Sequence, residues 1–126
     1  MKKLGISIYP EKTTEEKIIR YIDKASKSSF SRIFSCLLSV TETKKQIMEK
    51  FTRINEFAKE RDFEIILDVS PRIFDDLKIS YDDLSFFKEI KADGIRLDVG
   101  FTGLQESIMT FNEENLKIEI KENIEN

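Results

Sequence analysis

The chain has 126 residues, of which 40% are hydrophobic and 36% are charged, and this composition is typical of a soluble, well-folded domain. Its net charge of −3 argues against a nucleic-acid partner and against binding to an anionic membrane surface. The sequence contains no histidine, which excludes a His-containing triad or a His-rich zinc site in this segment and leaves acid–base chemistry to carboxylates.

Five short segments are predicted to be strands, and stretches long enough for a helix and two loops separate them. The segments are residues 4–9, 32–38, 63–69, 94–99 and 116–120. Unbroken alternation of strands and helices is typical of an α/β fold with a parallel sheet. No linker or second domain is visible in the sequence.

Helix starts are signalled between these strands. Residues 13–16 (TTEE) and 80–83 (SYDD) each predict a capping box at the start of a helix. Residues 43–61 predict a longer helix, because apolar side chains recur along one face. The last connection is expected to hold a short helix around residues 104–109.

Apolar and polar side chains alternate within the predicted strands. Ile95 and Leu97, for example, share one face, and Arg96 and Asp98 share the other. An open, doubly wound sheet buries both faces under helices and has nearly continuous apolar strands. One apolar and one polar face instead favour a parallel (β/α) barrel. We therefore expect residues 1–126 to form the N-terminal half of a TIM-barrel domain, about four and a half βα units.

Polar residues at the carboxyl ends of the strands are the candidate site, because the active sites of such barrels lie there. Several carboxylates near an arginine suit a glycosidase, in which two carboxyl groups flank the scissile bond. The same carboxylates could hold Mg²⁺, although we predict no metal and no cofactor. The predicted catalytic residues are Glu11, Asp68 and Asp98, and the predicted substrate-binding residues are Tyr9, Ser39, Arg72, Arg96 and Glu119.

Structural roles are the alternative for several of these residues. Arg96 and Asp98, two apart on one strand face, could form an ion pair that only fills the barrel interior. Glu11 could be a loop carboxylate stabilised by the dipole of the first helix. Glu64 lies near the start of its strand, so we predict a structural role for it. The single cysteine, Cys36, is expected to be a buried, inert thiol, and the lack of a possible disulfide fits a cytoplasmic protein.

Five stretches of the sequence resemble the bacterial 6-phospho-N-acetylmuramidase (MupG-type) family, whose members were earlier described as outer surface proteins of unknown function. They are residues 4–12 (LGISIYPEK), 32–39 (RIFSCLLS), 79–87 (ISYDDLSFF), 92–98 (ADGIRLD) and 100–103 (GFTG). The resemblance implies a cytoplasmic glycosidase that cleaves a phosphorylated MurNAc–GlcNAc disaccharide in cell-wall (peptidoglycan) recycling. It also implies a full (β/α)₈ barrel followed by a smaller, β-rich C-terminal domain.

The chain is shorter than this family, so we expect the C-terminal half of the barrel and the C-terminal domain to be absent. The usual phosphate site of such barrels is built by loops after strands seven and eight. A fragment without these loops is expected to be an incomplete enzyme. Residues 116–123 also end in charged side chains, where a small polar run would be expected.

Two other functions remain open from the sequence. A non-catalytic half-barrel could form a homo-oligomer or bind another chain through its open first and fifth strands. A Mg²⁺-dependent lyase or isomerase of a sugar phosphate would use the same carboxylates. In every case we expect no nucleic-acid partner and no membrane.

Overall fold

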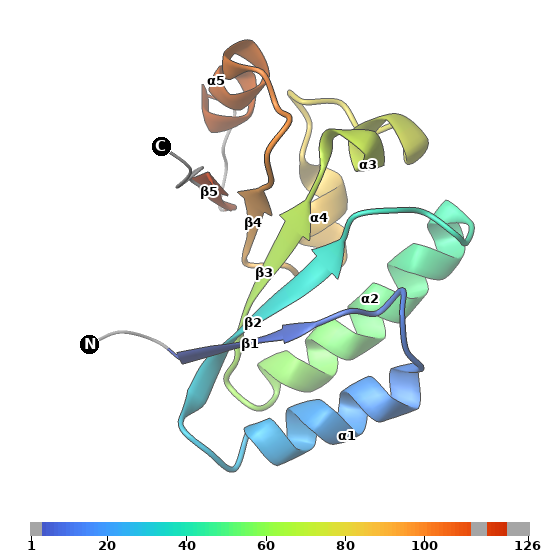
Figure 1. Ribbon diagram of the computed structural model, residues 1–126, viewed down its shortest axis with the longest axis vertical. Helices are drawn as coiled ribbons and strands as arrows, with labels where there is room; N and C mark the ends of the chain where they lie inside the picture. The colour runs from blue at the N-terminus through green and yellow to red at the C-terminus, as the bar shows by residue number, and fades with distance from the viewer. Residues whose placement is uncertain (1–3, 112–115, 121–126) are drawn as a thin grey trace.

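The computed structural model describes residues 4–111 and 116–120 and contains one parallel sheet with the strand order β1-β2-β3-β4-β5. The strands are β1 (Leu4–Ile8), β2 (Phe30–Leu37), β3 (Glu64–Val69), β4 (Gly94–Leu97) and β5 (Lys117–Ile120). The helices are α1 (Glu15–Ala25), α2 (Lys44–Lys59), α3 (Pro71–Asp76), α4 (Ser85–Glu89) and α5 (Gly103–Phe111). This α/β alternation with sequential parallel strands confirms the prediction of the first part of a TIM barrel (Figure 1).

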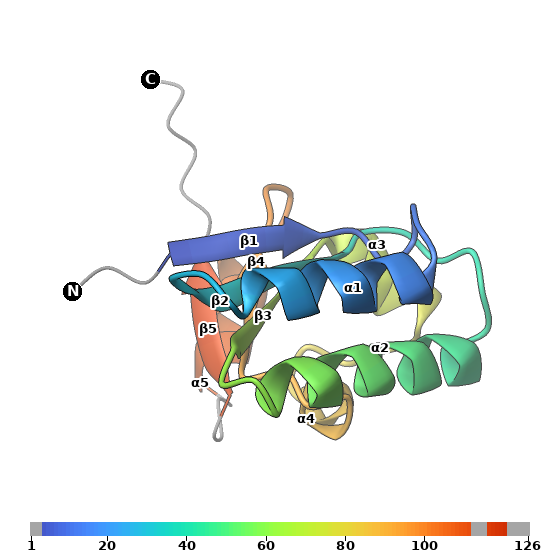
Figure 2. The same cartoon turned by 90° about the horizontal axis from the view of Figure 1, so that it is seen from below.

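The apolar face of the sheet is covered by helices, and α1 and α2 run side by side along it (Figure 2). One cluster of buried residues joins β1, β2 and β3 to these two helices, with Ile33 and Ile54 fully buried. A second cluster joins β3, β4 and the later helices around Leu67 and Phe87, which are also fully buried. Burying an apolar side chain of this size stabilises the fold by about 1.5–3 kcal/mol, so these clusters hold the helices against the sheet.

The opposite face of the sheet carries polar side chains and is strongly curved. Arg32 on β2 donates a hydrogen bond to Glu119 on β5, although β3 and β4 lie between them. In a flat sheet these two strands would be about 14 Å apart, since neighbouring strands are separated by about 4.8 Å. Contact between the two side chains therefore fits a sheet that curves toward this face, as the inner wall of a barrel does.

Three of the described helices begin with side-chain caps that their residue types favour, and at α5 the cap is the reciprocal pair of Thr102 and Gln105. Thr14, rather than Thr13, caps α1 by accepting a hydrogen bond from the Lys17 amide, so the predicted capping box of residues 13–16 is wrong in its position. The long helix α2 has a complete capping box between Thr43 and Gln46. Caps of this kind contribute about 1 kcal/mol each.

The predicted capping box at residues 80–83 is not a helix start. Ser80 donates to Asp82, and Asp83 accepts from the Ser85 amide, so these polar side chains stabilise a turn. The α4 helix follows this turn, with Leu84 at its N-cap and no side-chain cap. The short helix α3, with Pro71 in its first turn, was not predicted.

Strand β4 ends at Leu97, two residues earlier than predicted, and Asp98 therefore follows the strand. The predicted helix at 104–109 corresponds to α5. Among the helices that the structure describes, none is long and apolar enough to cross a membrane. The charged end of the fifth predicted segment, residues 121–123, lies outside the described residues.

Candidate active site

Glu11 and Ser39 follow neighbouring parallel strands, and the structure brings them into contact. The Ser39 amide and the Ser39 hydroxyl each donate a hydrogen bond to one oxygen of the Glu11 carboxylate, both at 3.2 Å. The two residues lie in the loops that follow β1 and β2. These loops are close together because the carboxyl ends of parallel strands share one edge of the sheet. Ser39 thus orients Glu11 through both oxygens of its carboxylate.

Asp68 and Arg96 form the second contact between predicted site residues. They are register partners on β3 and β4, and the Arg96 guanidinium donates to both Asp68 oxygens at 2.6 and 2.8 Å. Hydrogen bonding to Asp68 raises the pKa of Arg96 above its usual value. The Cys36 thiol lies 3.8 Å from the same carboxylate, and Arg96 lies over the Phe34 ring. Cys36 is buried, as predicted.

The Arg96 partner differs from the sequence-based alternative, in which Arg96 pairs with Asp98. Asp98 lies beyond the end of β4, where its amide donates to the Val69 carbonyl at 3.0 Å. One Asp98 oxygen accepts a hydrogen bond from the Val99 amide at 2.9 Å. Asp98 is therefore placed at the carboxyl edge of the sheet, next to the end of β3.

Glu119 is bound to cations on the polar face. It accepts from Arg32 and lies 3.3 Å from Lys117, while Arg32 also donates to Glu64 at 2.7 Å. Arg32 and Glu64 are register partners near the starts of β2 and β3. Glu119 thus joins a network that extends toward the amino-terminal end of the sheet, and the predicted structural position of Glu64 is consistent with this network.

The remaining two predicted residues lie at the rim. The Arg72 side chain on α3 is 74% exposed and lies 3.3 Å from Asp76 in the next turn. Tyr9, which directly follows β1, is about half exposed, and the Lys12 ammonium lies over its ring. The catalytic and substrate-binding roles of these residues remain predictions.

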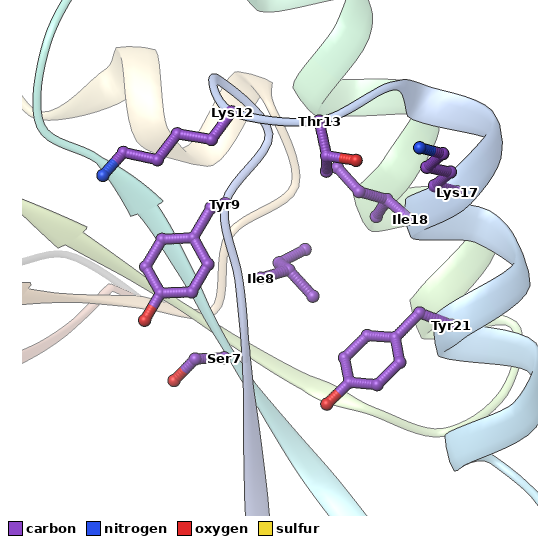
Figure 3. Close-up of a pocket in the computed structure, with 8 residues that line it drawn as sticks. All are labelled: Ser7, Ile8, Tyr9, Lys12, Thr13, Lys17, Ile18 and Tyr21. Carbon is purple, nitrogen blue, oxygen red and sulfur yellow. The ribbon is translucent and has the colours of Figure 1, made fainter.

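A hollow of about 420 Å³ lies along the outer edge of β1. Figure 3 shows Ser7 and Tyr9 on one side of the β1 ribbon and Ile8 on the other, next to Ile18 and Tyr21 of α1. Among the described strands, β1 has a neighbour on one side only. The hollow lies between β1 and α1, and neither Glu11 nor Ser39 is among the residues that line it.

Sequence reasoning missed the roles of Arg32 and Phe34 on the inner face. Both lie on the same face of β2 as Cys36, because side chains alternate along a strand. Phe34 is in contact with two guanidinium groups, those of Arg32 and Arg96. The alternation of residues 32–36 could have predicted this placement. Within residues 4–111 and 116–120, no three carboxylate or thiol groups gather closely enough to hold a metal ion.

A comparison with known protein families returns a match. A family model described as the N-terminal part of 6-phospho-N-acetylmuramidase matches residues 4–125. The chain belongs to this family. The match covers all five strands and both pairs of contacting site residues, so the resemblance stated from sequence motifs is confirmed. A comparison with curated proteins returns no match.

Two solved structures are similar to this member of the 6-phospho-N-acetylmuramidase family. An uncharacterized B. cereus protein is 52% identical with a TM-score of 0.72, and the match covers 94% of this chain and 30% of that one. A conserved protein from a locus in Enterococcus faecalis with an unknown function is 25% identical with a TM-score of 0.69, covering 94% of this chain and 31% of that one. The chain thus spans less than a third of the length of either structure.

Proposed function

We propose that this chain contributes part of the active site of a cytoplasmic glycosidase that cleaves a phosphorylated MurNAc–GlcNAc disaccharide during cell-wall recycling. The main support is the family match over residues 4–125. Glu11 and Asp98 at the carboxyl edge are suited to this chemistry, because glycosidases place two carboxyl groups beside the bond that breaks. The single cysteine supports the proposed compartment, since disulfides are rare there.

Within this proposal the two contacts have different roles. Asp68 is 9% exposed, and Arg96 donates to both of its oxygens. Asp68 is therefore suited to holding the Arg96 side chain in place and is less suited to acting on the substrate itself. Glu11 is partly exposed and is bound through a loop serine. We propose Glu11 as the carboxylate that faces the sugar, acting as nucleophile or base, and Arg96 as a substrate-binding cation.

The proposed substrate can be tested in a graft, in which residues 4–125 replace the matching segment of the 52% identical B. cereus protein. We expect the graft to cleave the disaccharide of 6-phospho-N-acetylmuramic acid and N-acetylglucosamine. Glu11→Gln should lower kcat by at least about 10³-fold, the size expected when a covalent or acid–base role is lost. Released N-acetylglucosamine measures the rate.

Glu16→Gln is the matched control, because Glu16 is an exposed carboxylate on α1 whose side chain is 81% accessible. Full activity in Glu11→Gln, or an equal loss in Glu16→Gln, would contradict the assignment of Glu11. The assay is repeated with a chelator. Loss of activity there would favour the Mg²⁺-dependent lyase or isomerase over the glycosidase.

A second proposal is that the outer edges of β1 and β5, which pair with no further strand in the part of the chain that the structure describes, bind a second copy of the chain. At the β1 edge Tyr9 and Tyr21 are 48% and 47% exposed, and at the β5 edge Ile120 and the nearby Phe111 are 50% and 89% exposed. Exposed apolar groups beside unpaired strand edges favour association. Sedimentation should then show a dimer that dissociates in Tyr21→Ser, whereas a stable monomer at high concentration would contradict this proposal.

A further inference from the structure

Lys50 lies on α2, and its ammonium group contacts the two loops that carry Glu11 and Ser39. Lys50 Nζ donates to the Pro10 carbonyl at 2.6 Å and lies 3.6 Å from the Glu42 carboxylate. Pro10 directly precedes Glu11, and Glu42 follows Ser39 by three residues. One side chain is thus bound to the loop after β1 and to the loop after β2.

The bond to Pro10 acts directly on the backbone of Glu11. The Pro10 carbonyl belongs to the peptide group that ends at the Glu11 Cα, and a peptide group is planar. Proline also fixes its own φ angle, which removes one of the two free rotations before this group. Holding the Pro10 oxygen therefore restricts the position and direction from which the Glu11 side chain leaves the backbone.

The surroundings of Lys50 favour a fixed ammonium group. Its side chain is only 18% exposed, and a shielded charge is costly unless it is paired and hydrogen-bonded. Besides Glu42, it faces the Glu15 carboxyl, whose pKa is lowered mainly by the hydrogen bond from Arg53 and to a lesser extent by Lys50. The helix that carries Lys50 is anchored by the fully or almost fully buried Phe51 and Ile54.

We infer that Lys50 is a positioning residue that holds the Glu11 carboxylate against Ser39, an inference that rests on the proposed role of Glu11 in glycoside cleavage. Lys50 does not touch the carboxylate itself. It acts by joining the two loops to the rigid α2 helix. Without it, the Glu11–Ser39 contact opens more often, and fewer molecules present Glu11 in the orientation needed for reaction.

Hydrogen exchange of the Ser39 amide in the full chain tests the positioning, because this amide donates to Glu11. In Lys50→Met we expect its exchange to become about tenfold faster, while the amide of Leu67 in the core reports global stability. Lys50→Arg should restore slow exchange, since it keeps a cation that can donate hydrogen bonds. The control is Lys59→Met, which removes an ion pair with Asp93 at the other end of α2.

Unchanged Ser39 exchange in Lys50→Met would overturn the inference, as would equal acceleration in Lys59→Met or at Leu67.

Kinetics of the graft supply the second readout. We expect Lys50→Met to lower kcat by about tenfold with KM changed by less than about twofold, because an interaction that aligns the reacting group affects mainly the transition state. Unchanged kcat beside an inactive Glu11→Gln would overturn the inference and leave the proposed function standing. Full activity of Glu11→Gln would instead contradict the proposed function, and Ser39 exchange would still decide whether Lys50 holds the contact.

Discussion

Asp68 and Arg96 form an ion pair between β3 and β4, and both belong to the candidate site. The Asp68 carboxylate is nearly buried, and the Arg96 guanidinium donates hydrogen bonds to both of its oxygens. The guanidinium in turn lies 4.1 Å from the centre of the Phe34 ring, which favours a cation over its face. The pair can therefore hold Arg96 rigidly at the polar face even in the absence of a substrate.

Replacing Arg96 with Met should lower the free energy of unfolding by about 2–3 kcal/mol, because the Asp68 carboxylate would remain shielded without its cation. Urea denaturation measures this change. Arg72→Met is the control, since Arg72 makes an exposed pair within one helix that contributes about 0–1 kcal/mol. If the free energy of unfolding falls as little in Arg96→Met as in Arg72→Met, the Asp68–Arg96 pair does not contribute to stability.

The choice of partner for Arg96 also shows what the sequence could not provide. Arg96 and Asp98 are both on the predicted polar face, and either Asp98 or Asp68 was available as a partner. The register of β3 against β4 decides between them, because it places Asp68 directly beside Arg96. That register depends on packing between distant segments, which a single sequence does not specify.

At the scale of elements, the strands were predictable because their apolar faces are buried against helices. Alternation in residues 63–69 and 94–99 identified β3 and β4 to within two residues at each end. The start of α4 was mistaken because Ser80 and Asp83 use their side chains in a turn instead of a cap. The six-residue helix α3 is too short to show a helical period in the sequence.

Gly94 on β4 allows close approach of β5. A Cβ atom added at this position would lie 2.6 Å from the Lys117 carbonyl oxygen, a backbone atom that cannot move away without disturbing the strand. We therefore expect Gly94→Ala to lower the free energy of unfolding by about 1–3 kcal/mol, the usual cost of overpacking. Guanidinium denaturation and the exchange of β5 amides measure the effect.

Gly103 provides the matched control, because an added Cβ there has no heavy atom within 4 Å. Gly103→Ala should leave the stability of the protein almost unchanged. A Gly94→Ala variant as stable as Gly103→Ala would contradict the close packing of β4 against β5.

At the scale of the whole molecule, the five strands form one curved wall with a candidate site along its carboxyl edge. The Glu11–Ser39 contact lies near one end of this edge and the Asp68–Arg96 pair near its middle. In a closed barrel, further strands would face them across the interior. This arrangement is why we expect the chain to supply some of the residues that surround the substrate, and the family match gives that substrate its proposed identity.

The most direct test of this account compares cleavage of the phosphorylated disaccharide by the 126-residue chain alone and by the graft into the B. cereus protein. We predict no turnover by the chain alone and turnover by the graft at a rate similar to that of the B. cereus protein. Efficient cleavage by the chain alone would contradict a shared active site. An inactive graft beside an active B. cereus protein would contradict the claim that this wall carries catalytic residues.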